Sequence, residues 1–430
     1  MTKQVNIGIL GYGVVGSGLY QLLLRNGEEI AQRVGVSLRV ARVADIDWRR
    51  PRPVFPPEEL RTTDPRQVVA DPDIPIIVET IGGVGVALDL VREALSAGKS
   101  VVTSNKEMIA KYGHELLDLA AAKGTDLFFE GAVGGTIPVI RALKESLQAN
   151  HLDTILGIVN GTTNYILTQM SEEGRPFAQV LADAQRLGYA EADPTDDVEG
   201  FDARNKLAIL SAIGFGLRAC VEDIFTEGIT RITPTDLRYA AQMGYVVKLL
   251  AIGRRHDGQV ELRVHPTLVP QAHPLASVRG AFNAIFIHGD GCGDVMLYGR
   301  GAGDLPTGSA VAGDVIEAAR NVLTGCRGRV LCTCLADAHV VPMAEVRTRT
   351  YLRLRVADRP GVLGKIATVF GEESVSLASV IQLDTDGQVA EIVMVTHQCP
   401  EGRLNKALER IEALDVVEAV ASRIRALDEH

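Results

Sequence analysis

The start of the chain limits its fold more than any other stretch. "VNIGIL", a short apolar strand, runs directly into the glycine pattern G-x-G-x-x-G, and leucines at helical spacing follow it. In a strand–turn–helix unit these glycines allow a tight turn, close approach of a pyrophosphate, and close packing of helix on strand. The N–H groups that open the helix would also bind phosphate. We therefore predict a dinucleotide site at Gly11, Gly13, Val14, Val15 and Gly16.

Residues at the end of the second strand bear on the choice between NAD and NADP. "LRVARVADID" ends in Asp45 and Asp47, and an acid at this point commonly binds a ribose hydroxyl, which favours NAD. Arg49 and Arg50 follow, and either could hold the additional phosphate of NADP or simply be solvated. The sequence leaves both cofactors open.

Strands and helices continue to alternate as far as residue 135, which predicts a Rossmann-type doubly wound α/β domain over residues 1–135. Thr80 ends one strand, and Lys106 follows the end of the next. Ligands of open parallel sheets bind at the carboxyl ends of the strands. Both residues are therefore predicted at the cofactor site.

Length and composition exclude several classes of protein. A chain of 430 residues suggests two or three domains, and its net charge of −10, without a dense Lys/Arg tract, gives no nucleic-acid surface. Six cysteines make no disulfide framework, and the Cys332–Cys334 pair completes no metal set. The strand at the N-terminus leaves no room for a signal peptide, and no apolar run approaches the roughly 18–20 residues of a membrane helix. We expect a cytoplasmic protein without membrane partners.

An acidic stretch at residues 188–206, "GYAEADPTDDVEGFDARNK", precedes the apolar run "LAILSAIGFG". A helix that begins near Val198 would place four residues on one face, at spacings of four, three and four: Asp202, Lys206, Ile209 and Ile213. Because the isoleucines should be buried, the lysine would extend a buried face beside many carboxylates. The simpler interpretation is an exposed Asp202–Lys206 ion pair, worth roughly 0.2–0.5 kcal/mol.

The chemistry of a dinucleotide enzyme favours a functional role for these residues. Hydride transfer to a carbonyl needs a proton donor for the developing alkoxide, and a lysine can supply it when its surroundings tune its pKa. Carboxylates can hold the ammonium group of an amino acid. The combination predicts a carbonyl substrate that carries a nearby amine.

Three motifs in one order resemble the homoserine dehydrogenases over about residues 5–325. They are "NGTTNYILTQM", "GYAEADPTDDVEGFDARNKLAIL" and "GRGAGDLPTGSAV". The resemblance implies reversible NAD(P)-dependent hydride transfer between L-homoserine and L-aspartate 4-semialdehyde, in the biosynthesis of threonine, methionine and isoleucine.

The resemblance also implies roles for individual residues. Lys206 matches the catalytic proton donor, and Lys106 matches a lysine near the nicotinamide that could share this role. The substrate's amine and hydroxyl would be bound by Glu191 and Asp202, beside a loop that contains Gly161 and Thr162. Gly301 and Gly303 match a turn that returns to the cofactor.

"EGAVGGTIP" resembles the family's loop for a monovalent cation, Na⁺ or K⁺. The ligands would be Glu130 and the carbonyl groups of Val133, Gly135 and Ile137. Residues 136–320 would form an α+β catalytic and oligomerisation domain of a homodimer or homotetramer. A helix that opens after Pro306, at about 305–325, would pack back on the first domain and close the cofactor site.

Residues 345–430 read as a separate βαββαβ, ferredoxin-like unit with a hairpin at "DTDG". "DRPGVL" resembles the ACT domain, a regulatory module that often binds amino acids. The backbone N–H groups of Gly361, Val362 and Leu363 open a helix and could meet an effector carboxylate. We expect feedback inhibition by threonine, and the alternative is a module that only holds subunits together.

Two rival functions remain open at this point. A cysteine-dependent semialdehyde dehydrogenase would need an activated thiolate, for which Cys220 and Cys292 are the candidates. A regulator that senses nucleotides and amino acids would have no use for Lys206.

Overall fold

The computed structural model describes residues 3–328, 332, 334, 336–383 and 389–428. The chain divides into two compact units, each assembled from segments that are distant in sequence. The first unit comprises Met1–Ile155, Asn205–Val221 and Phe282–Ala338, and the second comprises Leu156–Arg204, Glu222–Ala281 and His339–His430. Strand β7 (Leu152–Ile158) and helix α9 (Phe201–Phe215) run across the boundaries.

The first unit is built on a six-stranded parallel sheet in the order β3-β2-β1-β4-β5-β6. The prediction of a doubly wound fold is thus confirmed. Every residue of β4 and β5 is buried, as expected for parallel strands covered on both faces. The strands are β1 (Lys3–Leu10), β2 (Val36–Ala44), β3 (Arg61–Thr62), β4 (Ile76–Glu79), β5 (Ser100–Thr103) and β6 (Leu127–Phe128). The helices between them are α1 (Val14–Val34), α2 (Arg66–Val69), α3 (Val86–Ser96) and α4 (Lys106–Ala122).

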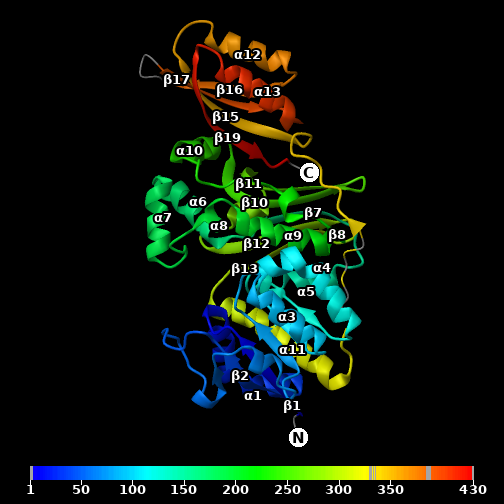
Figure 1. Cartoon of the computed structure of the whole chain (residues 1–430). Helices are drawn as coiled ribbons and strands as arrows, with labels where there is room; N and C mark the ends of the chain where they lie inside the picture. Colours follow the sequence, from blue (N-terminus) through cyan, green and yellow to red (C-terminus); the bar gives the residue numbers. More distant parts are fainter. Residues whose placement is uncertain (1–2, 329–331, 333, 335, 384–388, 429–430) are drawn as a thin grey trace. The chain divides into compact units, whose positions relative to one another are not determined.

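Helix α11 (Asp304–Thr324) returns from late in the sequence to pack on α1 (Figure 1). A Cβ atom at Gly18 would lie 2.2 Å from the carbonyl oxygen of Asp304, and one at Gly308 would lie 2.8 Å from the backbone nitrogen of Leu19. Glycine is therefore required at both crossing positions. The helix begins at Asp304, slightly earlier than predicted, because proline at 306 is tolerated in a first turn.

The remaining described elements of the first unit are short apart from one hairpin. Strand β12 (Phe282–Gly289) pairs antiparallel with β13 (Gly293–Arg300). Strand β8 (Leu217–Arg218) pairs with β14 (Ala336–Asp337), and helix α5 (Val139–Arg141) follows the loop after β6.

The second unit combines helices with an antiparallel strand pair, β10 (Tyr245–His256) and β11 (Gln259–Pro270). Strand β9 (Phe225–Thr226) pairs with β11 in parallel. The helices are α6 (Gly161–Glu173), α7 (Phe177–Arg186), α8 (Thr195–Val198) and α10 (Pro234–Gln242).

The C-terminal part of this unit confirms the predicted βαββαβ module, with strand order β19-β15-β17-β16 (Figure 1). Its elements are β15 (Arg347–Ala357), α12 (Val362–Glu372), β16 (Leu377–Leu383), β17 (Val389–Thr396), β18 (Cys399–Pro400), α13 (Glu401–Glu412) and β19 (Val417–Ala426). The predicted turn "DTDG" lies outside the described residues. Strand β19 also pairs with β11 at Arg425 and Ala426, so the module's sheet continues into the β10–β11 pair.

The acidic stretch corrects one prediction. Helix α9 begins at Phe201 rather than near Val198, because Gly200 adopts a φ of +85° and separates it from the short helix α8. The predicted buried face is nevertheless present: Ile209 and Ile213 are 3% and 9% exposed. No helix in the described part of the chain is long and apolar enough to cross a membrane.

Candidate active site

The three glycines of the first turn have different surroundings. These surroundings fit the three roles predicted for them, namely a tight turn, approach of a pyrophosphate and close packing of the helix. Gly11 has a φ of +88°, which a side chain would strain. A Cβ at Gly16 would lie 2.3 Å from the carbonyl oxygen of Gly11, so close packing of helix on turn requires glycine there. A Cβ at Gly13 would meet no atom within 4 Å. Gly13 therefore faces open space at the N-terminus of α1, where a pyrophosphate would bind.

A cavity of about 350 Å³ lies beside this turn. Its wall includes five predicted cofactor residues: Gly11, Gly13, Asp45, Arg50 and Thr80. The predicted Arg49 is exposed, and Val14 and Val15 belong to the first turn of α1. The hydroxyl of Thr80 donates to the carbonyl of Gly11 at 2.7 Å and so holds the glycine turn against β4.

Arg52, which the sequence analysis missed, also lines this cavity. Its guanidinium lies 3.3 Å from Asp45 Oδ2 and donates to the carbonyl oxygen of Tyr12, with only 8% of the side chain exposed. Asp45 accepts further hydrogen bonds from the backbone N–H groups of Tyr12 and Asp47. Arg50 is largely exposed and pairs with Asp47 at 3.2 Å. The charge of Asp45 is thus matched by Arg52, whereas Arg50 remains on the surface.

A buried acid joins the carboxyl ends of β4 and β5. Glu79 is fully buried, and burial raises the pKa of its carboxyl group. It accepts hydrogen bonds from the N–H groups of Ile81 and Gly82 and from the hydroxyl of Thr103. The acid within the apolar run "IIVET" was the available signal for this residue.

Lys106 is the first residue of α4, directly after this network. The N-cap Asn105 accepts a hydrogen bond from the N–H group of Met108 at 3.1 Å and donates to the carbonyl of Gly83 at 2.6 Å. Its own N–H group donates to Thr103. The backbone that carries Lys106 is therefore held by hydrogen bonds to both strand ends.

In the second unit, Asn160 brings two carboxylates together at the N-terminus of α6. Its amide nitrogen donates to Asp197 Oδ1 at 2.6 Å and to Asp202 Oδ2 at 2.9 Å. Its amide oxygen accepts from the N–H group and the hydroxyl of Thr163. Asn160 and Asp202 are 5% and 3% exposed, so the acid is held in a fixed, buried position. Neither Asn160 nor Asp197 was predicted as a site residue.

The other predicted substrate residues lie on both sides of this cluster. Gly161 is the first residue of α6, and the hydroxyl of Thr162 donates to the carbonyl of Tyr189 at 2.7 Å. Glu191 is exposed on the following turn, where its backbone carbonyl accepts a hydrogen bond from Gln185. The described hydrogen bonds link the start of α6 to the acidic stretch through Asn160 and Thr162, not through the side chain of Glu191.

Lys206 lies one helical turn after Asp202 on α9 and is 8% exposed. A largely buried ammonium beside a buried carboxylate on the same helix face is an arrangement that can deliver a proton. An exposed surface pair is therefore excluded as the explanation of this spacing.

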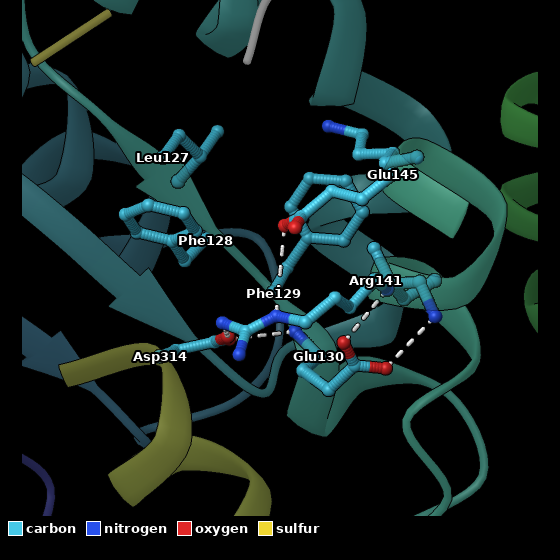
Figure 2. A pocket seen from close by; sticks show the side chains of 9 residues that line it. Leu127, Phe128, Phe129, Glu130, Arg141, Glu145 and Asp314 are labelled. Carbon is cyan, nitrogen blue, oxygen red and sulfur yellow. Dashed lines mark hydrogen bonds and ion pairs between the residues drawn. The ribbon is translucent and has the colours of Figure 1, made fainter. Parts of the chain in front are cut away.

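Glu130 lies in the loop predicted to hold a cation, and its carboxylate binds the start of α5 (Figure 2). The two oxygens accept from the N–H groups of Ile140 and Arg141 at 2.8 and 2.9 Å. The N–H group of Glu130 in turn donates to Asp314 on α11 at 2.8 Å. Burial, and then the nearby Glu130, raises the pKa of Asp314 to about 8. Glu130 therefore links the start of α5 to α11, a structural role that was not predicted from the sequence.

The rest of the loop packs on the "GRGAGD" turn. A Cβ at Gly135 would lie 2.5 Å from the carbonyl carbon of Gly301, and the N–H group of Thr136 donates to the carbonyl of Arg300 at 3.2 Å. Ile137 uses its carbonyl to accept from the N–H group of Val139. Gly303 has a φ of +131° and caps α11.

Known proteins match these features throughout the chain. A family model described as "Homoserine dehydrogenase, NAD binding domain" matches residues 11–130, one described as "Homoserine dehydrogenase" matches 138–316, and one described as "ACT domain" matches 350–416. A homoserine dehydrogenase from Neisseria gonorrhoeae is 43% identical over 98% of both chains, and one from Bacillus subtilis is 39% identical over 98% of both.

Solved structures give the same result. A homoserine dehydrogenase from Thiobacillus denitrificans superimposes with a TM-score of 0.92 and 46% identity over 99% of both chains. A hyperthermophilic archaeal homoserine dehydrogenase in complex with NADPH has a TM-score of 0.64 and 30% identity, covering 74% of this chain and 98% of that one.

Proposed function

The chain belongs to the homoserine dehydrogenase family, and from this premise we propose how its residues share the reaction between L-homoserine and L-aspartate 4-semialdehyde. The enzyme is an oxidoreductase with a nicotinamide dinucleotide cofactor, which supplies or accepts the hydride when it is bound. Because the chain belongs to this family, we set aside the two rival functions. These were a cysteine-dependent semialdehyde dehydrogenase and a regulator that senses nucleotides and amino acids.

Lys206 gives a proton to the alkoxide oxygen during reduction and takes it back during oxidation. The observation that carries this role is its burial one turn after the buried Asp202 on α9. Asp202, fixed by Asn160, binds the polar groups of the substrate, and Glu191 and the Gly161–Thr162 loop complete its binding. Lys106, at the fixed start of α4, would lie near the nicotinamide of a bound cofactor and would contribute a second positive charge.

Homoserine-dependent reduction of NAD⁺ and NADP⁺, followed at the nicotinamide absorbance, tests the reaction directly. We expect activity with both cofactors. If the folded protein reduces neither NAD⁺ nor NADP⁺ in the presence of homoserine, this reaction is not the one that it catalyses.

The arrangement around Asp45 supports NADP as the better cofactor. Arg52 neutralises the acid that would otherwise repel a 2′-phosphate, and the exposed Arg50 would exchange its surface pair with Asp47 for that phosphate. Arg50→Ala should lower kcat/KM for NADP⁺ by about tenfold or more, because a charge-assisted contact is lost, and change it little for NAD⁺. The exposed Arg33→Ala is the control. Equal losses with both cofactors would assign Arg50 to general binding instead.

The loop after β6 is proposed to bind Na⁺ or K⁺ through the carbonyl groups of Val133, Gly135 and Ile137, with Glu130 shaping the loop. Backbone carbonyls at a glycine turn are suitable ligands for a hard cation. Rates measured in sodium, potassium and choline chloride at one ionic strength test this, since equal rates in all three would count against the site.

We propose that residues 1–135 bind the cofactor, that residues 136–320 carry out catalysis and form the oligomer, and that residues 345–430 regulate the enzyme. Among the described residues β13 pairs with β12 alone, and it exposes Met296 and Tyr298. These features support a homodimer or homotetramer formed through this part of the chain. Sedimentation at the mass of a monomer would contradict it.

The ACT module is proposed to bind threonine at the N-terminus of α12. A cavity of about 310 Å³ lies there, lined by Gly361, Val362 and Leu363. Leu363→Glu adds a negative charge that repels the effector carboxylate, so the inhibition constant for threonine should rise by about tenfold or more while basal activity persists. Lys406→Gln, at an exposed position on α13, makes the same change in net charge and serves as control. If threonine does not inhibit the wild-type enzyme, the ACT module does not act as a threonine site.

A further inference from the structure

A second cavity in the ACT part of the chain lies beside α13 and β19. It measures about 380 Å³. Its walls come from α13, from β19, and from residues 227–232 of the second unit, a segment that follows β9. It shares no lining residue with the cavity beside Gly361.

Charges of both signs line this cavity. Arg423 and Arg425 are matched by Glu401, and Arg425 also by Glu227 at 2.6 Å. By contrast, three other lining residues have no ion pair within the described ranges: Arg231, Glu409 and Glu412. A cavity with one unmatched cation and two unmatched acids fits a small zwitterion, whose carboxylate and ammonium groups meet opposite walls. A simple anion such as phosphate would be repelled by the two acids.

The cavity is connected to the acids of the substrate region by direct contacts. Glu227, held by Arg425, is followed by Gly228, where a Cβ would lie 2.3 Å from the carbonyl oxygen of Val198. The N–H group of Ile229 donates to the same carbonyl at 2.8 Å. Val198 directly follows Asp197, which accepts the hydrogen bond from Asn160. Movement of the 227–232 segment would therefore move the carboxylates around Asn160.

We propose that this cavity is a regulatory site for a free α-amino acid, distinct from the site at α12, and that occupation changes the position of Asp197 and Asp202. The ligand's carboxylate binds Arg231 and its ammonium binds Glu409 and Glu412, which ties the 227–232 segment to α13. Binding at this cavity is independent of threonine binding at Gly361.

Calorimetric titration of the full-length protein with the twenty amino acids tests the site. At least one should bind to the wild type and to Leu363→Glu, but about tenfold or more weaker to Arg231→Ala and to Glu409→Gln/Glu412→Gln, because charge-assisted contacts are lost. Arg403→Ala, an exposed arginine on α13 outside the cavity, should bind as the wild type does. Because Arg231→Ala and Glu409→Gln/Glu412→Gln change opposite walls of the cavity, weaker binding in both cannot be due to misfolding of one variant alone.

The coupling has its own readout. The bound amino acid should change the KM for homoserine in the wild type, and Glu227→Gln, which weakens the link to Arg425, should keep binding but lose most of that change. Binding that survives Arg231→Ala yet disappears in Asp202→Asn would mean occupation of the substrate site and would overturn the proposal. No binding by any amino acid, or loss only in Leu363→Glu, would overturn it as well.

Discussion

Replacement of Lys206 by alanine should lower the kcat for homoserine oxidation by about 10²–10⁴-fold, the usual contribution of a positioned general acid or base. The side chain is 8% exposed and lies one turn from Asp202 on a single helix, so water cannot easily take its place. Cofactor binding should persist, because the glycine turn and the Asp45–Arg52 pair lie on elements other than α9. Stopped-flow hydride transfer and NADPH fluorescence measure the two effects independently.

Three further variants sharpen this result. Lys206→Arg keeps the charge but binds its proton too tightly to release it, so it should remain nearly inactive. Lys106→Ala should mainly raise KM, because its charge binds rather than transfers. A larger loss of kcat in Lys106→Ala than in Lys206→Ala would reverse the two roles. Asn160→Ala, which removes one hydrogen bond to Asp202 and leaves both lysines in the sequence, should raise the KM for homoserine and leave the pH profile of kcat unchanged.

The shared buried face of α9 could be predicted from spacing along a single element. Asp202, Lys206, Ile209 and Ile213 share one face because a helix repeats every three to four residues, and that holds wherever the helix begins. The start itself was wrong by three residues, since the effect of a left-handed Gly200 on the chain depends on its surroundings.

The residues that were missed act between elements. Asn160 joins Asp202 across 42 positions, and Arg52 joins Asp45 from a loop with no periodic pattern. Nothing in the local sequence states which elements will meet. The same limit applies to Gly18 and Gly308, whose close contact places α11 against α1 although about two thirds of the chain length separates them.

The fold was easier to predict than the site for a related reason. Glycine patterns, alternating strands and the order βαββαβ are local signals, and each of the modules they specify folds around its own apolar core. The continuation of the ACT sheet into β11 through Arg425 has no such local signal, because it depends on the pairing of an edge strand.

The same small change at two glycines of the first turn should have opposite consequences. Gly13→Ala places a methyl group in open space, so stability should hardly change, but the methyl occupies the position that a pyrophosphate needs. We expect dinucleotide affinity to fall by about tenfold or more. Gly16→Ala forces a Cβ to 2.3 Å from the carbonyl oxygen of Gly11 and 2.9 Å from the hydroxyl of Thr80. Overpacking of this kind should lower the free energy of unfolding by about 1–3 kcal/mol.

Urea unfolding and fluorescence titration with NADPH, applied to both variants, separate the two effects. Gly27→Ala is the control, because it lies on the same helix α1 and a Cβ there meets no atom within 4 Å. It should match the wild type in affinity and equal or exceed it in stability, since alanine favours helix. Unchanged NADPH affinity in Gly13→Ala would place the pyrophosphate elsewhere, and unchanged stability in Gly16→Ala would mean that the turn relaxes without cost.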